Sequence, residues 1–277
     1  MNINTDSLKS FLIVHEMKSF TKASEKLGLT QSALSQKIGR LEDGLEATLF
    51  IRNSEGLKLT DAGKKLFSFA RSQLQMQDDF LSNFKSYDQT LSGHIRLAGF
   101  SSIMRSILIP KLAPFQIKNP GLSIEYKVYE VIDLLNVLKR GEADMVVTDY
   151  MPMESGIESI HIGEEEYVLI QAKKNSNTLD IYLDHGPHDN ATESFFRFQG
   201  QSFKSRRGFM GDVYGILDGV AFGLGKAVMS KHLVENDSRF RIIPSRKKYV
   251  RPLALSYFKQ SYYPTSHLQL RDSILNF

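Results

Sequence analysis

Hydrogen-bonding side chains recur along one stretch near the start of the chain. They are Thr30, Gln31, Ser32, Ser35, Gln36 and Arg40. Glutamine can pair with the edge of adenine, arginine with guanine or phosphate, and serine with a base or the backbone. Two further cations, Arg52 and Lys58, can contact phosphates beside these residues. This set of side chains predicts recognition of double-stranded DNA.

A helix is needed to present these side chains together, and the sequence predicts one that Thr30 caps and that runs to about Leu45. Its apolar residues fall at i, i+4, i+7 and i+11, so the polar residues occupy the opposite face. Those apolar residues are Leu34, Ile38, Leu41 and Leu45. Two shorter helices precede it, one from Asp6 to Met17 and one that Thr21 is predicted to cap and Gly28 to end. Strands at 49–52 and 57–59, joined by an Asn-Ser-Glu-Gly turn, complete a winged helix-turn-helix that places one helix in the major groove.

The motifs S-F-T-K-A-S-E-K-L, T-Q-S-A-L-S-Q-K-I-x-R-L-E, L-F-x-R and L-T-D-A-G span roughly residues 6 to 65. This segment resembles the DNA-binding domain of LysR-type transcriptional regulators, although Ser32 stands where many relatives carry proline. The resemblance implies a DNA site with dyad symmetry, a dimer or tetramer of this chain, and RNA polymerase as a further partner. It also implies a C-terminal domain that binds a small-molecule effector.

A long helix without proline is predicted from Asp61 to about Tyr87, with Thr60 as its N-cap. Apolar residues with alternating 4-3 spacing form a heptad seam along it, which favours pairing of two copies. The alternative is a helix packed on its own domain. The predicted dimerisation residues are Leu66, Ala70, Phe80, Phe84 and Tyr87, with Gln73 and Gln77 between them. Residues 1–60 are therefore assigned to the DNA-binding domain and 61–92 to the linker helix and hinge.

Strands and helices alternate from residue 93 to the end, so the overall fold class is α/β with a mainly α N-terminal domain. The βαβαβ order near His94–Thr148 predicts a parallel sheet, and a second unit begins near Ala172. We assign 93–171 and 258–277 to lobe I and 172–257 to lobe II, with Val250–Lys259 as a strand that returns to lobe I. This two-lobed order resembles the effector domain of the same family, which is similar to periplasmic binding proteins.

Ligands of open α/β sheets bind beyond the carboxyl ends of the strands. That rule selects eight candidates for the effector site, each of which could instead be an ordinary cap or turn residue. They are Ser101, Ser102, Thr148, Asp149, Asp184, His185, Gly211 and Asp212. If the two serines hold an anion and Asp149, Asp184 and Asp212 hold a cation, a zwitterionic or basic amino-acid-like effector would fit.

Composition excludes several classes of function. The 277 residues include no cysteine, which excludes disulfides, thiolate nucleophiles and cysteine-based metal centres. His185, His188 and Asp189 lie in a turn without the further ligands a metal site needs, so no metal and no cofactor is expected. The acidic run Glu164–Glu166 is expected to be solvated. No apolar run is long enough to span a membrane, and no secretory signal is recognised, so a cytoplasmic protein is expected.

Net charge does not identify the partner, because the first 60 residues carry eight Lys and Arg against seven Asp and Glu. Three alternatives to an effector-controlled regulator remain at this point. One is a DNA-binding regulator with no small-molecule effector, and another is a cytoplasmic solute-binding protein. The third, an enzyme on the same α/β scaffold, is disfavoured because no coherent catalytic set is present, and the chain is expected not to be an enzyme.

Overall fold

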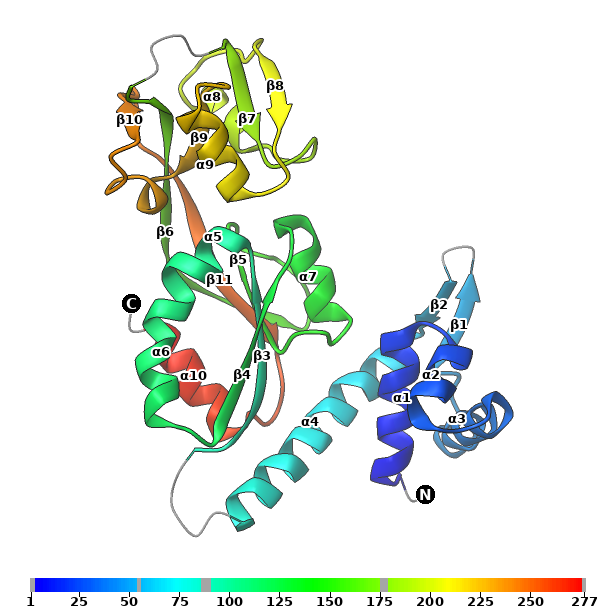
Figure 1. The fold of residues 1–277 in the computed structure, drawn as a ribbon. Helices are drawn as coiled ribbons and strands as arrows, with labels where there is room; N and C mark the ends of the chain where they lie inside the picture. Colours follow the sequence, from blue (N-terminus) through cyan, green and yellow to red (C-terminus); the bar gives the residue numbers. More distant parts are fainter. Residues whose placement is uncertain (1–2, 54–55, 86–90, 175–178, 276–277) are drawn as a thin grey trace.

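The computed structural model describes residues 3–53, 56–85, 91–174 and 179–275. Three bodies follow one another along the chain: a small N-terminal unit, one long helix, and two lobes stacked end to end (Figure 1). The N-terminal unit contains α1 (Thr5–Met17), α2 (Phe20–Leu27), α3 (Gln31–Leu45), β1 (Phe50–Asn53) and β2 (Gly56–Leu59). The winged helix-turn-helix predicted from the sequence is therefore confirmed.

Capping residues set the limits of these helices. Thr30 accepts a hydrogen bond from the amide of Ala33 at 3.2 Å, as predicted, and Gly28 ends α2 in the left-handed conformation with φ 65°. The predicted cap of α2 is wrong by two residues. Ser19, not Thr21, lies outside the helix in an extended conformation and accepts from the amide of Lys22. The conformation of the backbone, rather than the side-chain type alone, selects the cap.

The linker helix α4 (Asp61–Lys85) begins at its predicted cap, since the Thr60 hydroxyl accepts from the amide of Gly63 at 2.9 Å. Two of its predicted dimerisation residues are placed otherwise. Leu66 and Ala70 are 6% and 0% exposed within the hydrophobic core of the N-terminal unit, so they are not available to a second chain. The first turns of α4 thus complete the fold of their own domain, as the alternative interpretation held. The side chain of Phe84, and all of Tyr87, lie outside the described residues.

Lobe I is a parallel sheet in which β3 lies between β4 and β5, flanked by helices. Its elements are β3 (Gly93–Gly99), α5 (Ser101–Ile103), a π-helical turn (Met104–Leu108), α6 (Ile109–Lys118), β4 (Leu122–Val128), α7 (Val131–Lys139), β5 (Met145–Thr148) and α10 (Thr265–Leu275). The predicted βαβαβ order is confirmed. The buried faces of β3 and β5 pack against α6, α7 and α10 to form one core.

Lobe II repeats this plan on a smaller scale. Its elements are β7 (Ile181–Asp184), α8 (Ala191–Phe198), β8 (Arg206–Phe209), α9 (Val213–Ala221), β9 (Ala227–Ser230), a 3-10 turn (Lys231–Leu233) and β10 (Phe240–Ile243). Apolar side chains on the two faces of its sheet form separate clusters, one beneath α9 and one beneath α8. The strands β8 and β10 were not predicted, because each has only four residues and neither shows a clear alternation of apolar and polar side chains.

Two long antiparallel strands join the lobes (Figure 1): β6 (Ile157–Ala172) and β11 (Tyr249–Phe258). They pair along ten positions, and their register shifts between Leu253 and Ala254. β11 was predicted, but β6 was not. Each strand contributes one half to lobe I and the other half to lobe II. Among the described helices, none is long and apolar enough to cross a membrane.

Candidate functional sites

The predicted DNA-reading side chains lie together on the exposed face of α3. Gln31, Ser32, Gln36 and Arg40 are exposed and Ser35 is half-buried, whereas Leu34, Ile38 and Leu41 are buried. Gln31 donates to the hydroxyl of Ser35 at 3.4 Å, so adjacent turns of the helix are already linked. In Figure 1, α3 lies on the side of the N-terminal unit that faces away from the two lobes. This face is therefore open to a duplex.

The wing is held to α3 by one carboxylate. Glu42 accepts hydrogen bonds from the amides of Leu49 and Phe50, at 2.6 and 3.4 Å. The two predicted phosphate contacts on the wing are both exposed. Because Ile51 pairs with Lys58 and Arg52 pairs with Leu57, Arg52 and Lys58 point to opposite faces of the hairpin. The two cations thus project from both sides of the wing.

A pocket of about 1040 Å³ lies between the two lobes. Lobe I contributes the segments that follow β3, β4 and β5, and lobe II contributes those that follow β7 and β8. The pocket thus lies beyond the carboxyl ends of the strands of both lobes, as expected for an open α/β sheet. Its size is at the upper end of the roughly 300–1,000 Å³ that small-molecule sites occupy.

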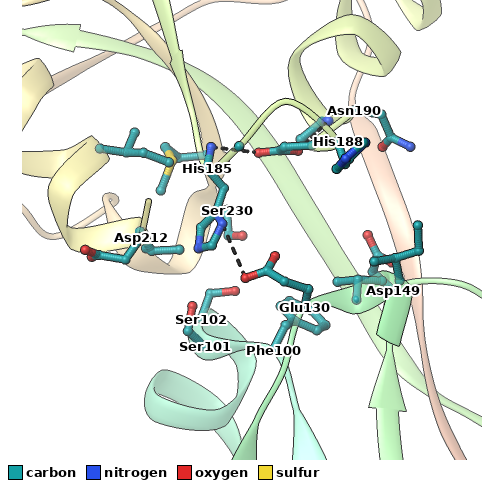
Figure 2. Close-up of a pocket in the computed structure, with 18 of the residues that line it drawn as sticks. Phe100, Ser101, Ser102, Glu130, Asp149, His185, His188, Asn190, Asp212 and Ser230 are labelled. Atoms are coloured by element: carbon teal, nitrogen blue, oxygen red, sulfur yellow. Dashed lines mark hydrogen bonds and ion pairs between the residues drawn. The ribbon is translucent and has the colours of Figure 1, made fainter. Parts of the chain in front are cut away.

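Six of the eight predicted effector residues line this pocket (Figure 2): Ser101, Ser102, Asp149, His185, Gly211 and Asp212. The other two do not. Thr148 is fully buried and donates its hydroxyl to the carbonyl of Tyr150, so it shapes the loop after β5. Asp184 is 2% exposed and accepts from Thr192 and Arg207 beneath the pocket wall. Both are structural residues, and their predicted role as ligands is wrong.

Most pocket carboxylates already have partners within the chain. Asp149 accepts from the guanidinium of Arg251 at 2.5 Å, and the same guanidinium donates to Asn190 of lobe II at 2.8 Å. Asp212 caps α9 by accepting from the amides of Tyr214 and Gly215 at 2.7 and 3.0 Å. These backbone hydrogen bonds lower the pKa of Asp212. Each of these carboxylates therefore has one oxygen engaged by the chain itself.

Glu130 is a pocket residue that the sequence analysis did not select. It lies just before α7 in lobe I, and its carboxylate is 3.4 Å from Nδ1 of His185 in lobe II. Figure 2 shows the two side chains meeting across the gap between the lobes. With its side chain 61% exposed, Glu130 keeps most of its surface open to solvent. Its place after β4 is the same signal that selected Ser101 after β3, and applying the rule to every strand would have found it.

Glu165, predicted to be solvated, is instead buried behind the pocket, with 2% exposure. Ser230 and Tyr167, which line the pocket, donate to its two oxygens at 2.5 and 3.0 Å. Burial raises the pKa of Glu165 to about 7 despite these hydrogen bonds. Alternation along β6 explains the difference from the prediction, because Glu164 and Glu166 point the other way.

Among the described residues, no three His, Asp or Glu side chains gather closely enough to hold a metal ion. His185 and His188 both line the pocket, but Asp189 uses its carboxylate to accept from the amides of His185 and Ala191. The turn is thus held together by backbone contacts.

Two family models match the chain. Residues 5–64 match the bacterial regulatory helix-turn-helix protein, lysR family, and residues 88–276 match the LysR substrate binding domain. The chain belongs to the LysR family. The N-terminal unit (residues 5–64), called the reader below, and the two lobes (residues 88–276), called the sensor, are therefore the two domains of LysR-type DNA-binding transcriptional regulators with an effector-binding domain.

Named members of the LysR family are similar to this chain over different lengths. The probable regulator LrrA of Synechococcus elongatus is 29% identical over 61% of this chain and 57% of its own length. The activator IlvY of Salmonella typhimurium is 25% identical over 83% of each chain. Full-length LysG of Corynebacterium glutamicum, solved with bound effector Arg, shares the fold with a TM-score of 0.74 at 18% identity, covering 99% of this chain and 97% of that one. These relatives are transcriptional regulators.

Proposed function

We propose that this LysR-family regulator responds to an effector that carries both a positive and a negative charge, bound between the lobes. The observation that supports this most is the set of groups facing one pocket from two sides. Ser101 and Ser102 open the helical segment of lobe I and offer hydroxyl and amide donors for a carboxylate. Glu130 offers a carboxylate for a cation.

The charge balance of the pocket favours a cationic group on the effector. Five carboxyl side chains line it, and Arg251 is the only Lys or Arg among the described lining residues. The five are Glu130, Asp133, Asp149, Asp189 and Asp212. Since Asp149, Asp189 and Asp212 accept shorter hydrogen bonds within the chain, a ligand cation is best met by Glu130, whose one ion-pair contact, to His185, is 3.4 Å long and whose side chain is 61% exposed. Asp133, in the first turn of α7, lies next to it in the pocket lining. The original assignment of the cation to Asp149, Asp184 and Asp212 is thereby replaced. Binding of Arg by LysG supports a basic amino acid as the first compound to test.

Calorimetry on the full chain tests this proposal. L-arginine is compared with agmatine, which lacks the carboxylate, and with citrulline, which lacks the charged side chain. Binding of L-arginine should weaken on Glu130→Gln or Ser102→Ala and should be unaffected by Glu164→Gln, which is exposed and outside the pocket. Heat with a neutral aromatic compound, and none with any amino acid, would show that the charge argument is wrong.

On DNA, we propose that Gln31, Ser32, Ser35, Gln36 and Arg40 read bases while Thr30 and the wing cations Arg52 and Lys58 contact the backbone. Two copies would bind a dyad-symmetric site, and RNA polymerase would be the partner recruited or blocked there. Sequencing of genomic fragments retained by the purified protein tests this. Enrichment of sites without twofold symmetry would contradict the pairing of two readers.

For the dimer, we propose a seam shifted from the predicted one. Phe69, Gln73, Met76 and Phe80 follow 4-3-4 spacing, and the three apolar members are 49%, 42% and 62% exposed. This spacing is that of a helix pair, and it lies on a face of α4 that the N-terminal core does not cover. Light scattering should show that Met76→Glu weakens the dimer, whereas Gln77→Glu, on the seam predicted from sequence, leaves it intact. The opposite result would restore the earlier seam.

A further inference from the structure

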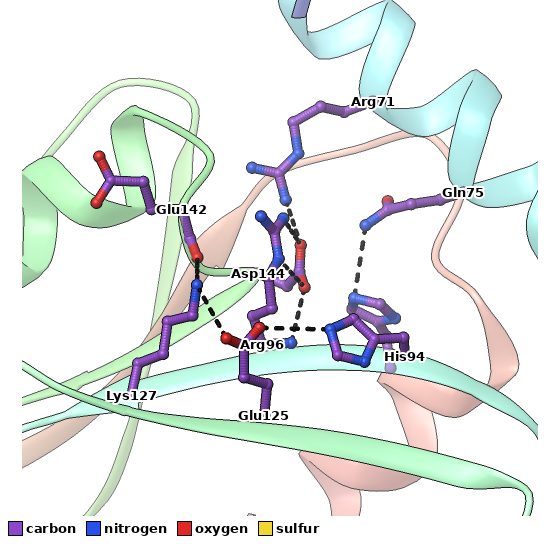
Figure 3. Close-up of polar contacts among 9 residues, drawn as sticks. Arg71, Gln75, His94, Arg96, Glu125, Lys127, Glu142 and Asp144 are labelled. Carbon is purple, nitrogen blue, oxygen red and sulfur yellow. Dashed lines mark hydrogen bonds and ion pairs between the residues drawn. The ribbon is translucent and has the colours of Figure 1, made fainter. Parts of the chain in front are cut away.

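One face of α4 is packed against lobe I (Figure 3). Phe67, Arg71 and Gln75 lie on it at spacings of four residues. The ring of Phe67 packs edge-on against Phe258 with 5.6 Å between centroids, and Gln75 lies 3.5 Å from Nε2 of His267. Ser72 adds a hydrogen bond to Gln260 at 2.8 Å. The linker helix therefore has a defined contact surface on lobe I, which we call its seat: Phe258, Gln260 and His267.

A buried ion pair forms the centre of this seat. Arg71 and Asp144 are each 7% exposed, and Nη2 of Arg71 lies 2.8 Å from Oδ1 of Asp144. Arg96 of lobe I donates two hydrogen bonds to the same carboxylate, from Nε at 3.1 Å and from Nη2 at 2.8 Å. Burial alone would raise the pKa of Asp144, but these two guanidinium groups hold it well below its ordinary range.

The two arginines differ in what their loss would do. Asp144 remains neutralised by Arg96 when Arg71 leaves, because both Arg96 and Asp144 belong to lobe I. Arg71, by contrast, is buried without its full set of partners, since its Nη1 has none among the described atoms. Burial accordingly lowers the pKa of Arg71. Separating a buried cation from its carboxylate while it stays buried is costly. We therefore expect Arg71 either to contact Asp144 or to leave the interface for water.

A single strand connects this contact to the effector pocket. Asp144 immediately precedes β5, and Asp149 immediately follows it. All four residues of β5 are buried, and the strand is held by β3 on one side and β11 on the other. At its far end, Asp149 binds Arg251, which lines the pocket and reaches Asn190 of lobe II. The short strand β5 therefore has one ion pair at the end next to the pocket, Asp149–Arg251, and another at the end next to the linker helix, Arg71–Asp144.

We propose that the Arg71–Asp144 pair is a latch that reports the state of the pocket to the DNA-binding domain. Rearrangement of the Asp149–Arg251 pair shifts β5, and this shift makes or breaks the contact with Arg71. The linker helix is then either seated on lobe I or released, which changes the orientation of the reader relative to the sensor. The proposal rests on the pocket being the effector site, but its first test needs no effector.

The test measures the distance between reader and sensor. Because the chain has no cysteine, cysteines introduced at the exposed positions Lys22 and Lys118 take spin labels without background. Labelled chains are diluted with unlabelled chains so that distances within one chain dominate. The wild type should give one narrow distance, and Arg71→Met should broaden it while lobe I stays folded. Arg96→Met, which removes the other arm of Asp144 and leaves Arg71 in place, should keep the narrow distance.

Coupling to the pocket is tested by Asp149→Asn, which weakens the Asp149–Arg251 pair without any ligand. It should shift the distance in the wild-type background and have no further effect in Arg71→Met. Equal shifts in both backgrounds, or a narrow distance retained by Arg71→Met, would overturn the latch. If Arg71→Met does not fold, Arg71→Gln, which also removes the charge but keeps a polar side chain, provides the same readout and should likewise broaden the distance. Failure of L-arginine to bind would count against the effector proposal alone.

Discussion

Replacing Glu165 by Gln should make the protein more resistant to unfolding in alkali. Its carboxyl group is buried behind the pocket, where its pKa is about 7 against an ordinary 4.5. Because the folded-state pKa is the higher one, the folded state holds the proton more tightly than the unfolded state. The stability that this provides is present at low pH and is lost as the pH rises through 7.

The magnitude follows from the shift of about 2.5 pKa units, at about 1.4 kcal/mol per unit. At about pH 8.5 the buried charge lowers the free energy of unfolding by about 3 kcal/mol relative to a side chain that does not ionise. At about pH 5.5 the difference is only about 1 kcal/mol, because the buried carboxyl group is still mostly protonated and folding requires only that the unfolded carboxylate take up a proton. The wild type should therefore lose about 2 kcal/mol over this range that Glu165→Gln retains.

Urea unfolding of both proteins at several pH values measures this difference. Glu164→Gln is the matched control, because Glu164 is the exposed neighbour on the same strand. Its curve should follow the wild type. If the free energies of Glu165→Gln and wild type run parallel from pH 5.5 to 8.5, the carboxylate is not held in the environment described, and the reasoning fails.

Three further outcomes are expected. Gly63→Ala should destabilise the reader by about 1–3 kcal/mol in thermal unfolding, because an added Cβ would lie 2.2 Å from the carbonyl oxygen of Leu49; an unchanged melting temperature would contradict this. In titrations against DNA, Gln36→Ala should cost about 1–3 kcal/mol of binding free energy at particular base pairs. Arg52→Ala should instead reduce the slope of log K against log salt concentration by about one for all sequences. If both variants lose affinity equally for all sequences, the division between base reading and phosphate contact is wrong. His15 packs edge-on against Phe67, with 4.8 Å between ring centroids, and burial lowers its pKa below 6.5. This packing should weaken as the pH falls through that pKa, and His15→Phe should remove the pH dependence from the spin-label distance.

The sequence predicted the reader closely because its signals are local. Caps such as Thr30 and the period of the apolar residues in α3 depend on neighbours within one or two turns. The same reasoning failed for Leu66 and Ala70. Their heptad spacing is real, but it does not say which of two apolar surfaces, the chain's own core or a second copy, will cover them.

Residues whose role depends on distant partners could not be assigned from the sequence. Glu165 is buried because Ser230, 65 residues away, donates to it, and Asp184 is removed from the pocket by Arg207. The seat of Arg71 on Asp144 joins residues 73 apart. Glu165 was predicted to be solvated, Asp184 was predicted to bind the effector, and Arg71 and Asp144 were not selected at all, because in each case the partner comes from another element.

The two strands that join the lobes limit how the sensor can respond. Since β6 and β11 remain hydrogen-bonded through both lobes, the lobes cannot slide past each other or drift apart without breaking the ladder. The register shift at Leu253 and Ala254 is the one irregularity along this pairing, opposite a glycine with φ 149° at Gly163. A change in the angle between the lobes must therefore bend or twist this ladder, whose pairing is interrupted only at that register shift.

This restriction on the relative motion of the lobes has a thermodynamic consequence for signalling. A ligand that must order two freely tethered domains loses much of its interaction free energy to their lost motion. Here the covalent and hydrogen-bonded frame has removed most of that motion before the ligand arrives. The proposed amino-acid effector, with few contacts to offer, would then need little interaction free energy to shift the balance between arrangements of the lobes. The pairing of β6 with β11 thus limits how much free energy is lost on binding, while the loops that line the pocket determine which molecule binds.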